Sequence, residues 1–366
     1  MKIVAFGLSI TSAWGNGHAT TFRALFDALH RRGHNILFFE KNLEWYASNR
    51  DLPEPPYCRL RLYDDWADIV NEARMELADA DVGLVGSYFP DGIAANDDLF
   101  DSSAAVKAFY DIDTPITIAG LRRAGRTEYL KAEQVSGFDV YFSFTGGPML
   151  REIENRFGAK AAVPLYCSFD PREYRRFGVN KRFACDVSYM GTFAPDRQAK
   201  LEGFLVRPAE RLPERKFIVA GPQYPKDIHW PKNVRRIVHL NPRWHARFYS
   251  SARLTLNITR REMVMAGYSP SVRLFEAAAC GATIVSDSWP GLDTFFCPGR
   301  EILLPVDCSD IERYLELEDD ELQLIGAAAQ RRVLVEHTSE VRAQQFEKAV
   351  AAALRHRDLS TSAMVG

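Results

Sequence analysis

The sequence lacks long apolar runs, paired cysteines and a net charge of either sign. No apolar run approaches the roughly 20 residues that a membrane-spanning helix needs. The 6 cysteines are scattered without a C-x-x-C pair, which argues against a zinc site and a disulfide framework. The 46 Lys and Arg nearly balance the 48 Asp and Glu, so net charge gives no reason to expect nucleic acid or an anionic membrane as partner. We therefore expect a cytoplasmic protein with no integral membrane segment.

What is present is the composition of a globular protein, with 46% hydrophobic and 26% charged residues in a 366-residue chain. That length suits two domains of ordinary size. In the first half, apolar runs such as "KIVAFG", "HNILFFE", "DVGLVGSY" and "FDVYFSF" alternate with helical patterns. These runs show no period-two alternation, so they are expected to be strands buried on both faces of a parallel sheet.

The alternation pauses around residues 158–182, where prolines and basic residues indicate a linker, and then restarts with "CDVSYMG", "KFIVAG", "LTLNITR" and "ATIVSDS". We expect a first domain at residues 1–165, a second at 166–338, and a last amphipathic helix with a frayed tail at 339–366. Two doubly wound α/β domains of this kind bind ligands at the carboxyl ends of their strands.

The segment "WGNGHAT" leaves the first strand through Gly15, Asn16 and Gly17 and starts a helix near His18. Glycines permit close backbone approach, and a helix start presents free N–H groups to a ligand. The spacing is not the dinucleotide pattern G-x-G-x-x-G, so a nicotinamide cofactor is not indicated. His18 is a candidate general base that takes a proton from an acceptor hydroxyl; the alternative is a residue that only shapes the loop.

Two further strand ends of the first half carry candidate residues. Asp111 and Asp113 in "FYDIDTP" share one face of a strand end, either to hold a metal ion or, as we prefer, to orient His18 or a sugar hydroxyl. Gly146 and Gly147 in "FSFTGGP" open another helix toward the same edge of the sheet, with an ordinary helix start as the alternative.

The second half predicts an anion site and a ribose contact. Arg197 opens a helix after "YMGTF", where its charge opposes the helix dipole unless an anion is bound. Ser271 and Val272 start a helix that offers N–H groups to a diphosphate, and Glu276, one turn further on, is placed to accept both ribose hydroxyls. The remaining donor-side candidates are Gly191, Thr192, Gly221, Pro222, His239, Leu240, Tyr268, Ser269 and Leu274.

These stretches, above all "LNITRREMVMAGYSPSVRLFEAAACG", resemble the glycosyl transferases group 1 family of GT-B glycosyltransferases, and most closely its CgeB-type (spore-maturation protein) branch. The resemblance implies two Rossmann-like domains facing a central cleft, with a nucleotide diphosphate sugar, UDP- or dTDP-linked, on the second. It also implies an acceptor of unknown identity on the first, a last helix that crosses back to the first domain, and no cofactor or metal.

The chain departs from the retaining members of this family, which carry a second Glu eight positions before the helix Glu. Here that position is Tyr268, so retention of anomeric configuration is in doubt. His18 with Asp111 and Asp113 resembles instead the base dyad of inverting relatives. The stereochemistry stays open.

Two alternative functions fit the same donor site. A sugar-nucleotide epimerase would use the donor without a separate acceptor. A non-catalytic binding protein would hold the nucleotide sugar and release no diphosphate.

Overall fold

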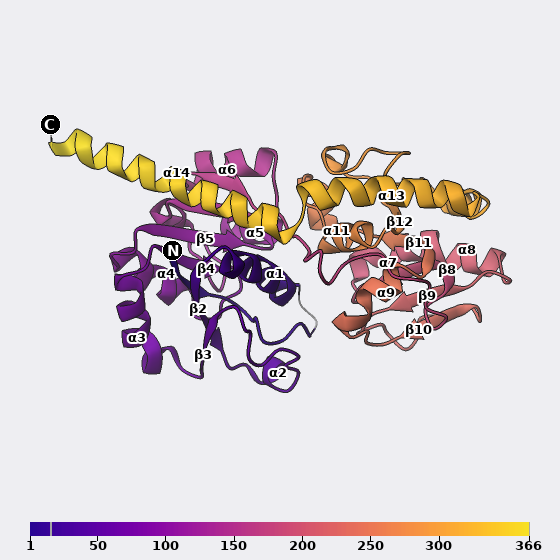
Figure 1. The fold of residues 1–366 in the computed structure, drawn as a ribbon, viewed down its shortest axis with the longest axis horizontal. Helices are drawn as coiled ribbons and strands as arrows, with labels where there is room; N and C mark the ends of the chain where they lie inside the picture. Colours follow the sequence, from indigo (N-terminus) through magenta and orange to yellow (C-terminus); the bar gives the residue numbers. More distant parts are fainter. Residues whose placement is uncertain (15–16, 366) are drawn as a thin grey trace. The chain divides into compact units, whose positions relative to one another are not determined.

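The computed structural model describes residues 1–14 and 17–365, and their side chains as far as Arg357. The chain divides into two compact units, each described here by itself. The first comprises Met1–Cys167 and Ser339–Gly366, and the second comprises Ser168–Thr338. Each unit contains one sheet flanked by helices (Figure 1).

The first unit is built on a seven-stranded sheet in the order β3-β2-β1-β4-β5-β6-β7, and all of its pairings are parallel. The order reverses at β1, which lies between β2 and β4. Its strands are β1 Lys2–Phe6, β2 Asn35–Lys41, β3 Arg59–Tyr63, β4 Val82–Gly86, β5 Val106–Asp111, β6 Val140–Ser143 and β7 Ala162–Pro164. Its helices are α1 His18–Arg31, α2 Glu44–Ala47, α3 Trp66–Ala78, α4 Gly92–Asp101, α5 Thr114–Ala124, α6 Pro148–Phe157 and α14 Ser339–Val365.

The second unit is built on a five-stranded parallel sheet in the order β10-β9-β8-β11-β12, which reverses at β8. Its strands are β8 Cys185–Met190, β9 Phe217–Ala220, β10 Val234–Ile237, β11 Ala252–Asn257 and β12 Thr283–Ser286. Its helices are α7 Pro195–Leu201, α8 Arg207–Arg211, α9 His245–Tyr249, α10 Arg261–Ala266, α11 Val272–Ala279, α12 Cys308–Leu315 and α13 Asp319–Glu336. The expected parallel, doubly wound sheets are thus confirmed in both halves of the chain.

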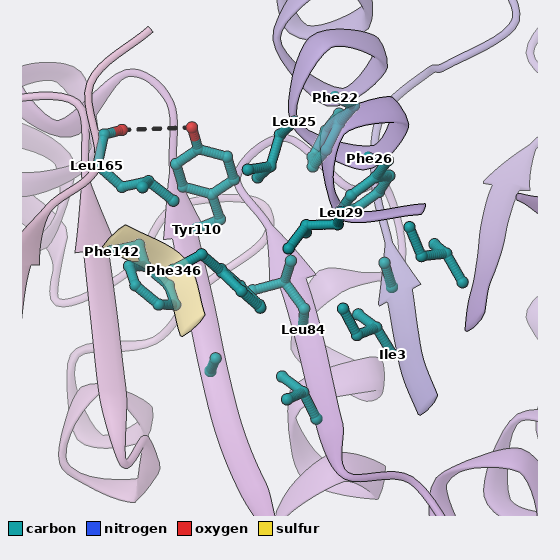
Figure 2. Packing of buried hydrophobic residues seen from close by; sticks show 14 of the residues in the cluster. Ile3, Phe22, Leu25, Phe26, Leu29, Leu84, Tyr110, Phe142, Leu165 and Phe346 are labelled. Atoms are coloured by element: carbon teal, nitrogen blue, oxygen red, sulfur yellow. Dashed lines mark hydrogen bonds between the residues drawn. The ribbon is translucent and has the colours of Figure 1, made fainter. Parts of the chain in front are cut away.

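Helix α1 shows how the apolar pattern produces the first core. Phe22, Leu25, Phe26 and Leu29 recur at helical spacing and all four are buried against the sheet (Figure 2). The helix ends where Gly33 adopts a φ of 87°, a conformation that favours glycine.

Helix α14 completes the same core from the far end of the sequence. Phe346 stacks on Phe142 of β6 with ring centroids 5.1 Å apart (Figure 2). Arg342 is buried, and its Nε donates to the carbonyl oxygen of Tyr166 at 3.0 Å. At the surface, Glu347 accepts hydrogen bonds from Arg32 at 2.7 and 2.8 Å and contacts His34 at 2.8 Å.

Several elements differ from the sequence-based expectation. The edge strand β3 and the short helix α4 carry little continuous apolar sequence, and β7 lies inside the segment expected to be a linker. The helix that was expected to open at Arg197 runs from α7 through a π-helical segment, Glu202–Val206, into α8. Helix α14 extends to Val365, through the segment expected to be frayed. In the described part of the chain, none of the helices has the length and apolar character to cross a membrane.

Replacing Glu347 with Gln should loosen α14 at neutral pH. The hydrogen bond from Arg32 is the main cause that lowers the pKa of Glu347 from 4.5 to about 2. The stabilisation is therefore complete above pH 4.5 and is lost as the pH falls toward 2. We expect a loss of about 1 kcal/mol in E347Q at pH 7, seen as about fivefold faster hydrogen exchange of α14 amides.

At pH 3 the wild-type helix should exchange more like the variant after correction for intrinsic rates. The control is E128Q, which alters an exposed carboxylate of the same unit. Equal protection of α14 in the wild type and E347Q at pH 7 would show that this ion pair does not hold the helix.

Candidate functional site

Each sheet reverses its strand order at one point, and the candidate residues gather there. In open parallel sheets, ligands bind outside the carboxyl ends of the strands at this reversal. In the first unit, the loops after β1 and β4 flank it; in the second, the loops after β8 and β11 do. His18 follows the loop after β1, and Arg197 follows the loop after β8. Ser271 follows β11 and the short helix α10.

His18 and Asp113 are brought together at the reversal in the first sheet. His18 is the first residue of α1, and its Nε2 lies 3.4 Å from Oδ2 of Asp113. The His18 ring is buried, whereas the Asp113 side chain is 32% exposed. Nδ1 of His18 is buried without a hydrogen-bond partner among the described residues. When Nε2 carries the proton that Asp113 accepts, Nδ1 retains a lone pair that can bind another proton.

Asp111 does not join this pair. Its carboxylate is fully buried and accepts hydrogen bonds from Tyr141 at 2.6 Å and from Thr117 at 2.7 Å. Burial raises the pKa of Asp111 to about 6, although both hydroxyl donors oppose the shift. Alternation along the strand end predicted a common direction for the two carboxylates, but the strand ends at Asp111, and Asp113 is the N-cap of α5 rather than a strand residue.

The glycine turns of the first unit have different roles. Gly17 is the N-cap of α1, while Gly15 and Asn16 lie outside the described residues. Gly147 is the N-cap of α6 with a φ of 60°. A Cβ at Gly146 would lie 2.0 Å from the hydroxyl oxygen of Tyr166, so close packing requires glycine there.

Arg197 lies on α7, at the reversal in the second sheet, without a carboxylate partner among the described residues. Its Nη2 donates to the carbonyl oxygen of Thr192 at 2.5 Å, and its Nε is buried without a hydrogen-bond partner. Burial lowers the pKa of Arg197, and the positive charges of Arg273 and Arg260 lower it further. A partly buried guanidinium group with two other arginines nearby is an environment that an anionic ligand would stabilise.

Arg273 lies beside Arg197 and was not among the residues expected from the sequence. Its side chain donates to the carbonyl oxygen of Met190 and to Oδ1 of Asn257, the latter at 3.0 Å. Ser271 donates to the same Asn257 oxygen at 2.8 Å and makes no capping hydrogen bond to its own helix. The first N–H groups of α11 are therefore left without the usual side-chain acceptor. The sequence signal that could have identified Arg273 is its position two residues after Ser271, the N-cap of α11.

Two loops approach closely beneath these arginines. A Cβ at Gly221 would lie 2.0 Å from the carbonyl oxygen of Gly191, and a Cβ at Gly191 would lie 2.9 Å from Arg273. Pro222 accepts a backbone hydrogen bond from Phe193 at 3.1 Å, and Tyr224 donates to the carbonyl oxygen of Gly191 at 3.2 Å. Glycine at both positions thus lets the strand ends meet below the guanidinium groups.

Glu276 is buried in α11 rather than exposed on its surface. Tyr249 donates to its Oε2 at 3.4 Å, and the Tyr174 hydroxyl and the charge of Arg273 also stabilise the carboxylate. Burial outweighs these partners and raises the pKa of Glu276 to about 7. Near neutral pH this carboxyl group therefore changes between an acid and an acceptor-only carboxylate.

The other donor-side candidates differ in what they offer. Leu274 is fully buried in the core, so its side chain contacts protein rather than ligand. The Leu240 carbonyl oxygen already faces Nε2 of His245 at 3.1 Å, next to the exposed His239. Tyr268 has a φ of 47°, and its N–H donates to the carbonyl oxygen of Pro290. Partly buried Val272 and buried Ser269 lie on either side of the N-cap of α11.

Metal-ligating side chains do not cluster in the described residues: no group of three or more His, Cys, Asp or Glu there could hold a metal ion.

Inorganic pyrophosphate should raise the melting temperature of the protein. Replacing Arg197 with Gln should remove most of this shift, because the variant loses the one buried guanidinium Nε without a partner in the described part of the chain. R211Q, which alters an exposed arginine of the same unit, serves as the control and should keep the full shift. A full shift in R197Q, measured by differential scanning fluorimetry, would show that the anion does not bind there.

Comparison with known proteins bears on both the fold and the activity. Residues 197–348, under half of the chain, match a family model described as glycosyl transferase-like. Sucrose-phosphate synthase from Thermosynechococcus elongatus has a TM-score of 0.69 at 14% identity, with 99% of this chain and 100% of that chain covered. HepE from Anabaena, solved with UDP and glucose, has a TM-score of 0.70 at 13% identity, with 96% and 100% covered. No curated protein sequence matches the chain.

An alpha-glucosyltransferase solved with UDP-glucose and DNA containing an abasic site is also similar, with a TM-score of 0.69 at 13% identity and 96% and 99% of the two chains covered. The structural likeness extends over almost the whole of each chain and shows the α/β GT-B fold. On this fold, the glycosyl transferase-like match identifies the protein as a glycosyltransferase.

Proposed function

We propose that the protein transfers a sugar from a UDP-linked donor to an acceptor hydroxyl, as a member of the CgeB-type branch that its motifs resemble. The observation that carries the proposal is the buried, unpaired Nε of Arg197 beside Arg273 at the reversal in the second sheet. Similar structures, HepE and the alpha-glucosyltransferase, were solved with UDP or UDP-glucose, which supports a UDP-sugar as the anion. The cytoplasmic location stays a prediction.

The donor diphosphate would lie against Arg197, Arg273 and the first N–H groups of α11. In the reaction, the bond between the anomeric carbon and the diphosphate oxygen breaks, and negative charge develops on the departing UDP. Fixed guanidinium and N–H donors stabilise that charge without reorganising. Asn257 holds Ser271 and Arg273 in place through one oxygen, which keeps the donors oriented before the substrate arrives.

His18 would assist the acceptor. The acceptor oxygen forms the new bond to the anomeric carbon, and its proton passes to the imidazole of His18 while Asp113 stabilises the imidazolium. A base on the acceptor hydroxyl favours inversion at the anomeric carbon. Asp111 supports the strand end on which this pair depends and takes no part in the proton transfer.

Replacing His18 with Ala should lower the rate of transfer from UDP-glucose by about 10² to 10⁴, the usual worth of a positioned base. The assay is release of UDP in the presence of a pool of sugar, polyol and phenolic acceptors. H30A alters an exposed histidine of the same helix and should retain full activity. UDP binding should be unchanged in both variants, because neither residue belongs to the second unit.

An unaltered rate in H18A would remove His18 from the reaction. Isomerised sugar formed from UDP-glucose without an acceptor would instead identify an epimerase. Binding of UDP-glucose with no release of UDP to any acceptor would identify a binding protein.

Glu276 should make UDP-glucose binding pH-dependent. Its pKa is raised to about 7 by burial, so the carboxylate that accepts two ribose hydroxyls is present mainly above that pH. Affinity should therefore rise with pH through 7, since binding favours the ionised form. The diphosphate diester of UDP-glucose has no proton to lose in this range, which leaves the dependence to the protein.

E276Q should bind UDP-glucose about ten- to a hundredfold more weakly and without this pH dependence, by calorimetry between about pH 5.5 and pH 8.5. E312Q changes a carboxylate of α12 and should bind like the wild type. An unchanged pH profile in E276Q would mean that another group titrates.

A further inference from the structure

A chain of hydrogen-bonded groups connects Glu276 to the loop that follows β10 in the second unit. The Tyr174 hydroxyl is hydrogen-bonded to the Glu276 carboxyl group, and the same hydroxyl lies 3.3 Å from Nδ1 of His245. Nε2 of His245 lies 3.1 Å from the carbonyl oxygen of Leu240. Tyr174, Leu240 and Glu276 are all buried. The chain therefore joins the candidate ribose contact to a loop that carries another donor-side candidate.

The partners of His245 determine which of its nitrogens carries a proton. Burial lowers the pKa of His245 to about 4, so the ring is neutral at pH 7 and has a single N–H group. The Leu240 carbonyl oxygen can only accept, so Nε2 carries the proton and donates to it. Nδ1 therefore has a lone pair, and the Tyr174 hydroxyl is its donor.

The Tyr174 hydroxyl has one proton and two acceptors that require it. When Glu276 is protonated, its O–H can donate to the Tyr174 oxygen, and Tyr174 can donate to His245. When Glu276 is ionised, the carboxylate needs the Tyr174 proton, and Nδ1 of His245 then loses its donor. A buried acceptor without a donor costs free energy of folding. The chain is therefore fully hydrogen-bonded only while Glu276 carries a proton.

The other groups that act on Glu276 come from three segments. Tyr249 of α9 donates to Oε2 at 3.4 Å, the positive charge of Arg273 lowers the pKa of Glu276, and the charge of Glu173 raises it. Cys280, the C-cap of α11, also interacts with this carboxylate. Tyr174 differs from these groups because its one proton is also required by His245.

We propose that Tyr174 and His245 are positioning residues of the donor site, which favour protonated Glu276 while the site is empty. This inference rests on the proposed function, since it concerns the same ribose contact. When the donor binds, the Glu276 proton leaves to solvent and the Tyr174 O–H turns from Nδ1 of His245 to the carboxylate. The two ribose hydroxyls donate to the same carboxylate. The empty site thus avoids a buried charge without enough donors.

The first test measures UDP-glucose binding to the whole protein by calorimetry between about pH 5.5 and pH 8.5. His245→Gln places an amide near the Nε2 position, so it keeps the donor to Leu240 and removes the Nδ1 acceptor. Tyr174 then donates to the carboxylate alone, and the midpoint of the affinity profile should fall by about one pH unit. At pH 6 this variant should bind about fivefold more tightly than the wild type, and at pH 8.5 within about twofold.

Two further variants separate this effect from structural damage. His245→Asn keeps an acceptor near the Nδ1 position and loses the donor to Leu240, so its midpoint should stay at the wild-type value. In a Tyr174→Phe background, His245→Gln should leave the midpoint unchanged, because the hydroxyl that couples the two residues is absent. The proposal is wrong if His245→Gln does not move the midpoint, or if it moves the midpoint equally without Tyr174.

A second test uses neither nucleotide nor a substitution of His245. In protein with isotope-labelled histidine, nitrogen NMR should show the Nδ1 signal of His245 shifting as Glu276 titrates near pH 7, although the ring stays neutral. Glu276→Gln should abolish this shift. The exposed His229 is the control, and its signals should be the same in both proteins. An Nδ1 signal that does not shift, or a shift that persists in Glu276→Gln, would show that the Tyr174 proton does not move.

The two tests distinguish this proposal from the proposed function. If UDP-glucose binds at no pH, the proposed function fails, and nitrogen NMR still decides whether Tyr174 shares its proton. If UDP-glucose binds with a pH profile that His245→Gln leaves unchanged, only the assignment of Tyr174 and His245 fails.

Discussion

The candidate donor site depends on the partly buried guanidinium group of Arg197, which has no carboxylate partner among the described residues. Lys200, three residues after Arg197, shows the ordinary arrangement: its ammonium group pairs with the buried Asp287 at 2.6 Å. Arg197 has instead a carbonyl oxygen, other arginines and a buried Nε without a partner in the described part of the chain. An unpaired buried donor costs on the order of 1–3 kcal/mol of folding free energy, more when the group is charged. A dianionic ligand that supplies the missing acceptor would remove this free-energy cost on binding, and the difference would add to the affinity for the ligand.

The sheets and helices of both units could be predicted from the sequence more completely than the side-chain contacts could. Continuous apolar runs separated by helical patterns predicted parallel sheets, because strands that are buried on both faces and joined by helices are typical of α/β folds. β3 escaped prediction because it lies at the sheet edge, where "RLRLY" is half exposed. β7 escaped because three residues with a proline give no pattern. Short and peripheral elements are fixed by their neighbours rather than by their own composition.

Some residues of the candidate site could be predicted from the sequence and others could not. Glycine turns, the "SPSVRLFE" helix start and the His18–Asp113 pair could be found from the sequence, because spacing after a strand fixes which edge a residue occupies. Arg273 and Asn257 could not be ranked from the sequence, because their importance lies in a hydrogen bond between a helix and a neighbouring strand end. The same limit applies to Asp111 and Asp113, which differ by two positions and yet differ completely in exposure.

The two carboxylates have different roles at the end of one strand: Asp111 stabilises the fold, and Asp113 contacts the candidate base. Asp111 accepts hydrogen bonds from two hydroxyls and is fully buried, so moving it would disturb Tyr141 and Thr117. Asp113, beyond the strand end, keeps solvent contact and a long 3.4 Å approach to His18. The fully buried carboxylate therefore stabilises the end of the strand, while the partly exposed one is placed to orient the imidazole of the candidate base.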